Sequence, residues 1–205
     1  MGKGRAIVVT GTPGTGKTRF ARLLAKKLDT DLINLTKFAE EHDLIERYDR
    51  TRRTYVIGEN SLKRELEKHL ASLRREVLVE GHYSARLVPR HLSQIVFVLR
   101  CDPEILRSRL RRRGYPRGKI GENVEAEVLD ICLDEAVAVH RPRKIAEIDT
   151  TSRTTTSCVE EALGILAGKR ARHIGRHDWI AELERKGRLD EFLKERATAW
   201  RKKSS

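Results

Sequence analysis

The segment GTPGTGKT at residues 11–18 constrains the fold of this chain more than any other part of the sequence. It fits the pattern G-x-x-x-x-G-K-[ST] and follows RAIVVT, an apolar run without alternation that is typical of a central parallel strand. Its glycines permit a tight loop whose backbone N–H groups point at phosphate oxygens, and the N-terminus of a following helix favours an anion. The segment therefore predicts a strand, a phosphate-binding loop and a helix, in that order.

The side chains of this loop indicate which ligand it binds. Lys17 can reach the β- and γ-phosphates of a nucleotide, and the hydroxyl of Thr18 can take a place on Mg²⁺. We therefore expect ATP and Mg²⁺ as cofactors. The loop leaves the acceptor open, because transfer to water would make the protein an ATPase and transfer to a second ligand would make it a kinase.

The rest of the chain alternates between strand patterns and helix patterns. Apolar runs at 32–35, 77–80 and 95–99, and a weaker one at 145–149, join the run at 5–10 as predicted strands. Helical patterns cover 18–28, 62–73 and 122–139, another helix begins at 102–103, and the last opens with a capping box at 157–160. This order predicts a doubly wound parallel sheet of five strands, the α/β fold of P-loop NTPases.

Length and charge bound the organisation of the chain. Its 205 residues suffice for one core, so we expect a main domain at 1–168 and a basic helical extension at 169–205. The net charge of +13 favours a polyanionic partner such as nucleic acid, nucleotide or ribosome. We expect two short amphipathic helices in the extension to pack on the main domain, with docking to a partner as the alternative. Their apolar residues are Trp179, Ile180, Leu183, Leu189, Phe192, Leu193 and Trp200.

Cysteine usage and hydropathy indicate the cellular compartment in which the protein is expected. Cys101, Cys132 and Cys158 are odd in number and widely spaced, which favours reduced, packed thiols over a disulfide framework or a metal site. The start of the chain has only a short apolar stretch, and no later run reaches a membrane-spanning length. We expect a cytoplasmic protein, or a nuclear one if the cell has a nucleus, with no membrane contact.

An acid and a histidine follow the predicted strand at 77–80, where the sequence reads VLVEGH. Because neighbouring parallel strands bring their carboxyl ends to one crevice, Glu80 is expected to meet the Mg²⁺ of a bound triphosphate, directly or through water. His82 is expected to orient the acceptor or an attacking water. A buried structural histidine is the alternative.

A run of arginines at 107–119, RSRLRRRGYPRGK, surrounds a glycine-flanked break. On a helix, Arg109, Arg112 and Arg113 share a face, and such groups at a break could swing over a phosphate and stabilise its charge. The run therefore predicts a lid over the nucleotide. Contact with RNA phosphates is the alternative for the outlying arginines.

Several motifs taken together resemble a known family. These are GTPGTGKT, INL after the second strand, VEGH, IVFVLRCDPEILRSRLRRRGY and KIGENVEAEV. Over residues 5–167 they resemble the nuclear-type adenylate kinases (isoenzyme-six type), which have archaeal members and are also described as ATPases of small-ribosomal-subunit assembly.

This resemblance implies a nucleoside-monophosphate region at about 34–57 and a short lid at about 112–122. It implies transfer of phosphate from ATP to AMP, slow ATP hydrolysis, and binding of a small-subunit ribosomal protein and the pre-ribosomal particle during maturation of the small-subunit rRNA. Glu80 and His82 take the positions of the family's aspartate and histidine. Residues that the resemblance places at ATP are Gly14, Gly16, Lys17, Thr18, Arg19, the lid arginine Arg113, and Arg153 after the last strand.

The chain also departs from this family. Glu80 replaces an aspartate, which places the carboxylate one methylene further out. An arginine for the acceptor phosphate is missing from 36–41, TKFAEE, where Lys37 is the available cation. The segment 48–55, YDRTRRTY, is more basic than in the family and could bind an acceptor phosphate or RNA.

Three functions follow as hypotheses. The first is a broad-specificity nucleoside monophosphate kinase that acts on AMP. The second is an assembly ATPase whose acceptor is water and whose partner is a ribosomal protein, pre-ribosomal particle or rRNA. The third is a kinase of another small metabolite, which the same fold would allow.

Overall fold

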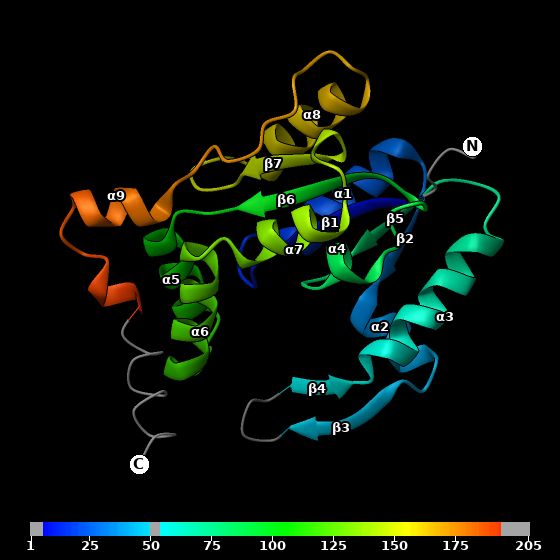
Figure 1. Cartoon of the computed structure of the whole chain (residues 1–205), viewed down its shortest axis with the longest axis horizontal. Coiled ribbons are helices and arrows are strands. Elements are labelled where there is room, and N and C mark those ends of the chain that lie inside the picture. The colour runs from blue at the N-terminus through cyan, green and yellow to red at the C-terminus, as the bar shows by residue number, and fades with distance from the viewer. Residues whose placement is uncertain (1–5, 50–53, 194–205) are drawn as a thin grey trace.

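The computed structural model describes residues 6–49 and 54–193, with the backbone alone for 48, 49 and 54–57. Its centre is a parallel sheet of five strands in the order β2-β5-β1-β6-β7, which confirms the predicted fold class (Figure 1). The strands are β1 (Ala6–Gly11), β2 (Asp31–Asn34), β5 (Val77–Glu80), β6 (Ser93–Arg100) and β7 (Ile145–Asp149). All five predicted apolar runs are therefore strands of one sheet.

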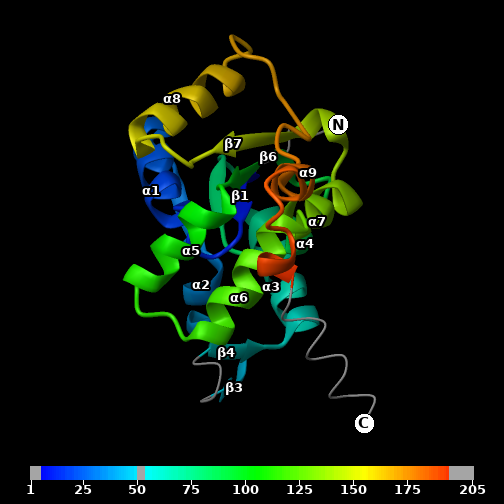
Figure 2. The same cartoon turned by 90° about the vertical axis from the view of Figure 1, so that its left-hand side faces the viewer.

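Helices cover both faces of this sheet (Figures 1 and 2). Ile7 and Val9 of β1 pack towards α1 (Lys17–Leu28) and α8 (Thr155–Leu166). Ala6 and Val8 pack towards the opposite layer. That layer contains α2 (Leu35–Glu41), α3 (Glu59–Ser72), α4 (Ser84–Leu87) and α7 (Ile131–Val139), followed by a short 3-10 turn η1 (Pro142–Lys144). Because both faces are buried, the central strands β1 and β6 carry continuous apolar runs, at 6–9 and 95–99, rather than alternating patterns.

A separate apolar cluster joins α5 (Pro103–Arg112) and α6 (Arg117–Val128) to the C-terminal extension. Asp102 accepts hydrogen bonds from the backbone of Glu104 and Ile105, so it caps α5 as predicted. Leu183 of α9 (Trp179–Arg185) and Phe192 are buried in this cluster. The extension therefore packs on the main domain as predicted, with its apolar residues against α5 and α6 and with backbone hydrogen bonds to Glu147 of β7. Trp200 lies outside the described residues.

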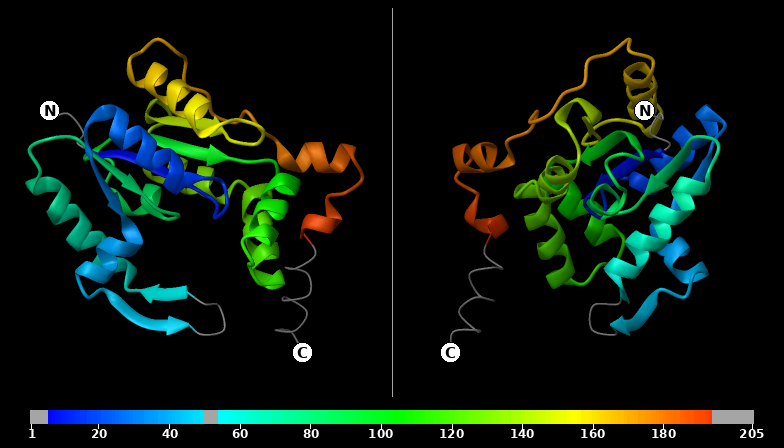
Figure 3. Two further views of the ribbon diagram at one scale, coloured as in Figure 1. Left: turned by 180° about the vertical axis from the view of Figure 1, so that it is seen from behind. Right: turned by 45° about the vertical axis from the view of Figure 1, so that its right-hand side comes forward.

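Two segments project on the same side of the sheet (Figure 3). One is the pair α5 and α6. The other is an antiparallel hairpin of β3 (Ile45–Asp49) and β4 (Thr54–Ile57), which lies within the predicted monophosphate region. The sequence patterns did not predict these strands. The side chains of the basic segment 48–55 lie outside the described part of the chain.

The single helix predicted over 122–139 is wrong. The structure has α6 ending at Val128 and α7 starting at Ile131, with Asp130 in the left-handed region at φ 54°. This left-handed turn between the two helices lets the Asp130 carboxylate pair with the buried Arg100. Periodicity could not reveal this break, because Arg100 is distant in the sequence.

The predicted cap of the last helix is also wrong by three residues. Thr154 caps α8 by accepting a hydrogen bond from the backbone N–H of Ser157 at 3.1 Å, so Ser157 lies inside the helix. Four consecutive hydroxyl residues stand at 154–157, and the first of them takes the capping position.

The three cysteines are buried as free thiols, as predicted. Burial raises the pKa of Cys101 and of Cys132 to about 12, so these thiols are uncharged at neutral pH. Among the helices of the described ranges, none has the length and apolar character needed to cross a membrane.

Candidate active site

The phosphate-binding loop connects β1 to α1 at the centre of the sheet. The carbonyl oxygen of Thr12 accepts hydrogen bonds from Thr15 Oγ1 at 2.8 Å and from Lys17 Nζ at 3.1 Å. Gly14 has φ +100°, and a Cβ there would lie 2.7 Å from Leu106 Cδ1. Glycine is therefore required at 14 both for its conformation and for the close approach of α5.

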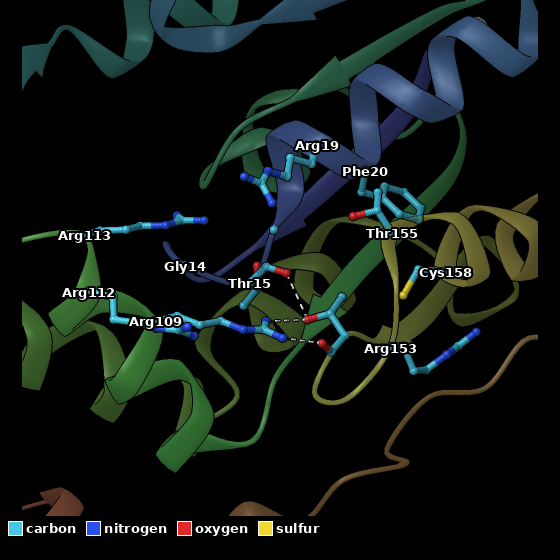
Figure 4. A pocket seen from close by; sticks show the side chains of 12 residues that line it. Gly14, Thr15, Arg19, Phe20, Arg109, Arg112, Arg113, Arg153, Thr155 and Cys158 are labelled. Carbon is cyan, nitrogen blue, oxygen red and sulfur yellow. Dashed lines mark hydrogen bonds between the residues drawn. The ribbon is translucent and has the colours of Figure 1, made fainter.

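A cavity of about 390 Å³ lies beside this loop (Figure 4). It brings together the predicted ATP residues Gly14, Gly16, Arg19, Arg113 and Arg153 with others from α5 and α8. A smaller cavity of about 210 Å³ contains Lys17 and Thr18, and Arg19 and Arg113 line both. The geometry thus offers one space for a nucleoside and an adjoining space for phosphates. The cavity's other lining residues are Thr15, Phe20, Arg109, Arg112, Thr150, Thr155 and Cys158.

Arg109 has an anchoring position that the sequence did not reveal. Its Nη2 donates to the carbonyl oxygens of Thr150 at 2.6 Å and Thr151 at 2.9 Å, in the loop after β7. Arg153 is likewise held by protein groups, since it pairs with Glu161 and donates to the Ser157 carbonyl at 3.0 Å. Arg109 thus joins α5 to this loop, and Arg153 lies on the opposite wall of the cavity (Figure 4).

Glu80 and Thr18 form a set of oxygen ligands suited to Mg²⁺. Glu80 ends β5, is 2% exposed, and its Oε1 lies 3.3 Å from Thr18 Oγ1. Asn34 donates from its side chain to the same carboxylate oxygen. A hydroxyl and a carboxylate are hard oxygen donors of the kind that Mg²⁺ prefers, so these residues fit that ion. Asn34 was not among the predicted site residues, although its place at the end of the neighbouring strand was a usable signal.

His82 contacts the start of the phosphate-binding loop. Its Nδ1 lies 3.2 Å from the carbonyl oxygen of Gly11 and 3.5 Å from Cys132 Sγ. Burial and, next, the positive charge of Lys17 lower the pKa of His82 to about 4. At neutral pH the ring is therefore uncharged, and Nδ1 donates to Gly11. This leaves Nε2 as a hydrogen-bond acceptor.

A third cavity, of about 260 Å³, is lined by Glu80 and by Thr18, which it shares with the smaller cavity at the loop. Two cations, Arg22 and Lys37, line it. Besides Glu80, a second acidic residue, Glu41, lines it. Its remaining lining residues are Leu32, Ile33, Asn34, Phe38, His42 and His69. Arg22 was not singled out from the sequence, because nothing in the order of residues shows that this face of α1 lies opposite α2.

The arginine run divides between two sides of α5. Arg109, Arg112 and Arg113, which were expected to share a helical face, all line the 390 Å³ cavity beside the loop. Three others, Arg107, Arg111 and Arg117, line a separate cavity of about 650 Å³ together with Tyr115, Ile120, Gly121, Val124, Glu191 and Phe192. The guanidinium of Arg107 lies 3.9 Å above the centre of the Phe192 ring.

Comparisons with known proteins agree with this architecture. The sequence model of a family described as an AAA domain matches residues 7–130. A Pyrococcus abyssi protein named "Putative adenylate kinase" is 42% identical over 173 residues, which span 84% of this chain and 90% of the relative. A protein of the same name from Methanocaldococcus jannaschii is 35% identical over 173 residues, covering 84% of this chain and 92% of the relative.

Solved structures show the same fold at lower identity. Shikimate kinase from Acinetobacter baumannii has a TM-score of 0.58 at 16% identity, covering 82% of this chain and 96% of that chain. A sugar kinase from Janibacter has a TM-score of 0.55 at 16% identity, covering 80% and 94%. The chain therefore has the P-loop kinase fold and belongs to the family of these archaeal adenylate-kinase-type proteins.

Proposed function

We propose that the chain is a nucleoside monophosphate kinase that transfers the γ-phosphoryl group of ATP to AMP. The observation that carries this proposal is the 260 Å³ cavity, because it shares Thr18 with the smaller cavity at the loop, contains Glu80 and supplies Arg22 and Lys37. A second phosphate compound held there would meet the transferring group at Thr18. The names of the two archaeal relatives support AMP as that compound.

In the proposed reaction, the bond from the γ-phosphorus to the bridging oxygen of ATP breaks and a bond to a phosphate oxygen of AMP forms, which yields two ADP. Lys17 and Arg113 neutralise charge on the transferring group, and Thr18 and Glu80 hold Mg²⁺. Mg²⁺ held by these residues would supply positive charge to the phosphates during transfer. The Nε2 atom of His82 accepts a hydrogen bond from the acceptor or from water. Positioning and charge stabilisation suffice for this chemistry, so no covalent nucleophile is needed.

The proposal also assigns regions and ligands. ATP is held by Gly14, Gly16, Lys17, Thr18, Arg19, Arg113 and Arg153. Residues 34–57 hold the monophosphate, 112–122 close over the nucleotide, and 169–205 form an extension of the kinase domain. The buried free thiols support a reducing compartment such as the cytoplasm.

The direct test is to incubate the protein with Mg-ATP and AMP and to separate the nucleotides. We expect ADP far above the amount that a sample without AMP releases by hydrolysis, and parallel reactions with CMP, GMP and UMP measure the breadth of specificity. If the amount of ADP does not exceed that released by hydrolysis without AMP, the kinase proposal is contradicted. ATP hydrolysis would then be the remaining activity.

The acceptor site has its own test. Replacing Lys37 or Arg22 by Met is expected to raise the KM for AMP about tenfold or more, because each removes one charged hydrogen-bond donor. The KM for ATP should stay unchanged. Lys26→Met is the matched control, since Lys26 is an exposed cation on α1 outside the cavity. An unchanged KM for AMP in both variants would show that AMP does not bind in this cavity.

A second candidate is an ATPase that acts with the RNA or protein of the small ribosomal subunit. The cavity with Arg107, Arg111 and Arg117 favours it, because these arginines lie outside the nucleotide cavity and can meet phosphates of RNA. The double variant Arg111→Ala/Arg117→Ala should weaken RNA binding and reduce its salt dependence while ATP binding stays intact. Arg64→Ala, on the exposed side of α3, is the control. Equal binding by all proteins, and no co-purification of ribosomal protein, would rule this candidate out.

A further inference from the structure

A buried carboxylate on α6 reaches the phosphate-binding loop. Glu127 is 2% exposed, and its Oε2 accepts a hydrogen bond from Thr12 Oγ1 at 2.6 Å. Its Oε1 accepts from Arg100 Nε at 2.9 Å and from the backbone N–H of Cys101 at 3.0 Å. Both carboxylate oxygens are thus occupied, and Glu127 bridges the end of β6 to the second residue of the loop.

Thr12 also contacts the catalytic lysine, Lys17, through its backbone. Its carbonyl oxygen accepts from Thr15 Oγ1 at 2.8 Å and from Lys17 Nζ at 3.1 Å. The side chain of Thr12 is fixed by Glu127, while its carbonyl fixes the lysine. A rotation of Thr12 would therefore move both the loop backbone and the Lys17 ammonium.

The position of Glu127 is itself fixed by a cluster of buried charges. Arg100 pairs with Glu127, Glu147 and Asp130, so its guanidinium is surrounded by three carboxylates. Glu147 Oε2 also accepts the backbone N–H of Arg176, in the C-terminal extension, at 2.9 Å. Because every partner is held by another, the carboxylate of Glu127 has little freedom to turn.

We propose that Glu127 is a positioning residue for phosphoryl transfer. It holds the hydroxyl of Thr12, and through Thr12 it sets the loop that aims Lys17 at the transferring phosphate. This inference rests on the proposed use of ATP at the loop. A misplacement of a catalytic group by about 1 Å can reduce turnover by about a hundredfold, so the function of Glu127 should appear mainly in kcat.

The test is a double-mutant cycle with Thr12→Val and Glu127→Gln. Valine keeps the shape of Thr12 without the hydroxyl, and glutamine keeps the shape of Glu127 without the charge. We expect each single variant to lose at least tenfold in kcat, with less than a threefold change in the KM for ATP. If Glu127 acts through Thr12, the double variant is no slower than the slower single variant. Losses that multiply, or a Thr12→Val variant with wild-type kcat, would overturn the proposal.

Further variants separate positioning from folding. Thr12→Ser retains the hydroxyl and should recover most of the activity that Thr12→Val loses, which a purely structural role in packing would not produce. Glu122→Gln removes an exposed carboxylate from the same helix and should behave as the wild type. If Glu127→Gln fails to fold, the valine and serine variants still decide the question. Absence of ATP binding by the wild-type protein would instead refute the proposed function.

Discussion

At the scale of single residues, burial sets the charge of the basic groups around the sheet. Burial lowers the pKa of Lys17, an effect that the neighbouring carboxylates of Glu80 and Glu127 oppose. Burial also lowers the pKa of His82 and of His140. Burial thus deprives the Lys17 ammonium of solvating water, which is unfavourable. The negative charge of a bound polyphosphate would offset this loss.

Replacement of Lys17 by Ala should abolish most phosphoryl transfer and leave the fold intact. We expect kcat to fall by at least about a hundredfold, because a positioned charge on the transferring group is lost. The melting temperature should hardly change, since the variant removes a desolvated charge rather than a packed apolar group. Coupled-enzyme kinetics measure kcat, and circular dichroism measures the melting temperature. Lys27→Ala, which replaces an exposed lysine of the same helix, is the control. Unchanged turnover would remove Lys17 from the mechanism.

His140 gives the protein a pH-dependent stability. It is 2% exposed, its Nε2 donates to the Ala85 carbonyl at 2.7 Å, and its Nδ1 accepts from Ser93 Oγ at 2.9 Å. Since its folded pKa is lowered by burial, only the unfolded chain binds a proton there as the pH falls below about 6.5. The free energy of unfolding should therefore decrease on acidification.

Urea denaturation between pH 7.5 and 5 measures this effect of His140. The variant His140→Gln keeps a donor and an acceptor without a titrating group, so its stability should fall less steeply over the same interval. Parallel pH curves for the two proteins would show that another group is responsible.

At the scale of helices and strands, hydrophobic patterns predicted the elements well and their ends less well. The run at 32–35 is a strand only as far as Asn34, because the Asn34 side chain accepts from the Lys37 backbone at 3.0 Å and starts α2. Residues 122–139 are two helices because Asp130 turns back towards Arg100. In each case a polar side chain ends the element through a contact that periodicity does not describe.

The cap of α8 gives a prediction at this scale. Thr154→Ala should lower the free energy of unfolding by about 1 kcal/mol, because the N–H of Ser157 loses its acceptor. Thr154→Ser retains the oxygen and should stay close to the wild type. Chemical denaturation of the wild type and the two variants measures these free energies of unfolding. Equal stability of the alanine and serine variants would show that the cap contributes nothing.

At the scale of the whole molecule, the C-terminal extension is part of the nucleotide-binding half of the protein. Besides the apolar contacts of Leu183 and Phe192, Arg188 pairs with Glu104 at the start of α5. The extension thus contacts the helix that carries Arg109 and Arg112, which line the 390 Å³ cavity beside the loop. Movement of α5 would require the extension to move with it or to detach.

Phe192→Ala tests how firmly the extension is attached. Phe192 is 4% exposed and lies beneath Arg107, so its truncation should cost about 3 kcal/mol or more of unfolding free energy. Hydrogen exchange should become faster in α9 and in α5, and Phe192→Leu should reduce both effects. Unchanged exchange in α5 would show that the extension does not restrain this helix.

The sequence predicted the sheet and the phosphate-binding loop because both depend on local patterns, an apolar run and a glycine-lysine motif. It also predicted Glu80 at the loop, from the rule that parallel strands end in one crevice. The same rule applies to Asn34, which ends the neighbouring strand opposite Glu80. Contacts of Arg22 and Glu127 could not be predicted in this way. Their partners come from segments that are joined only by the packing of helices on the sheet, and charge or polarity alone does not select among many similar residues.

The cluster around Arg100 has a consequence for how relatives of this protein can change. Arg100, Glu127 and Glu147 lie far apart in the chain, yet the buried guanidinium pairs with both buried carboxylates. Losing the arginine would leave two buried carboxylates without this cation, whereas replacing all three residues by apolar ones removes the charges together. Across many homologous sequences these three positions should therefore covary, either retaining the charges together or exchanging them together.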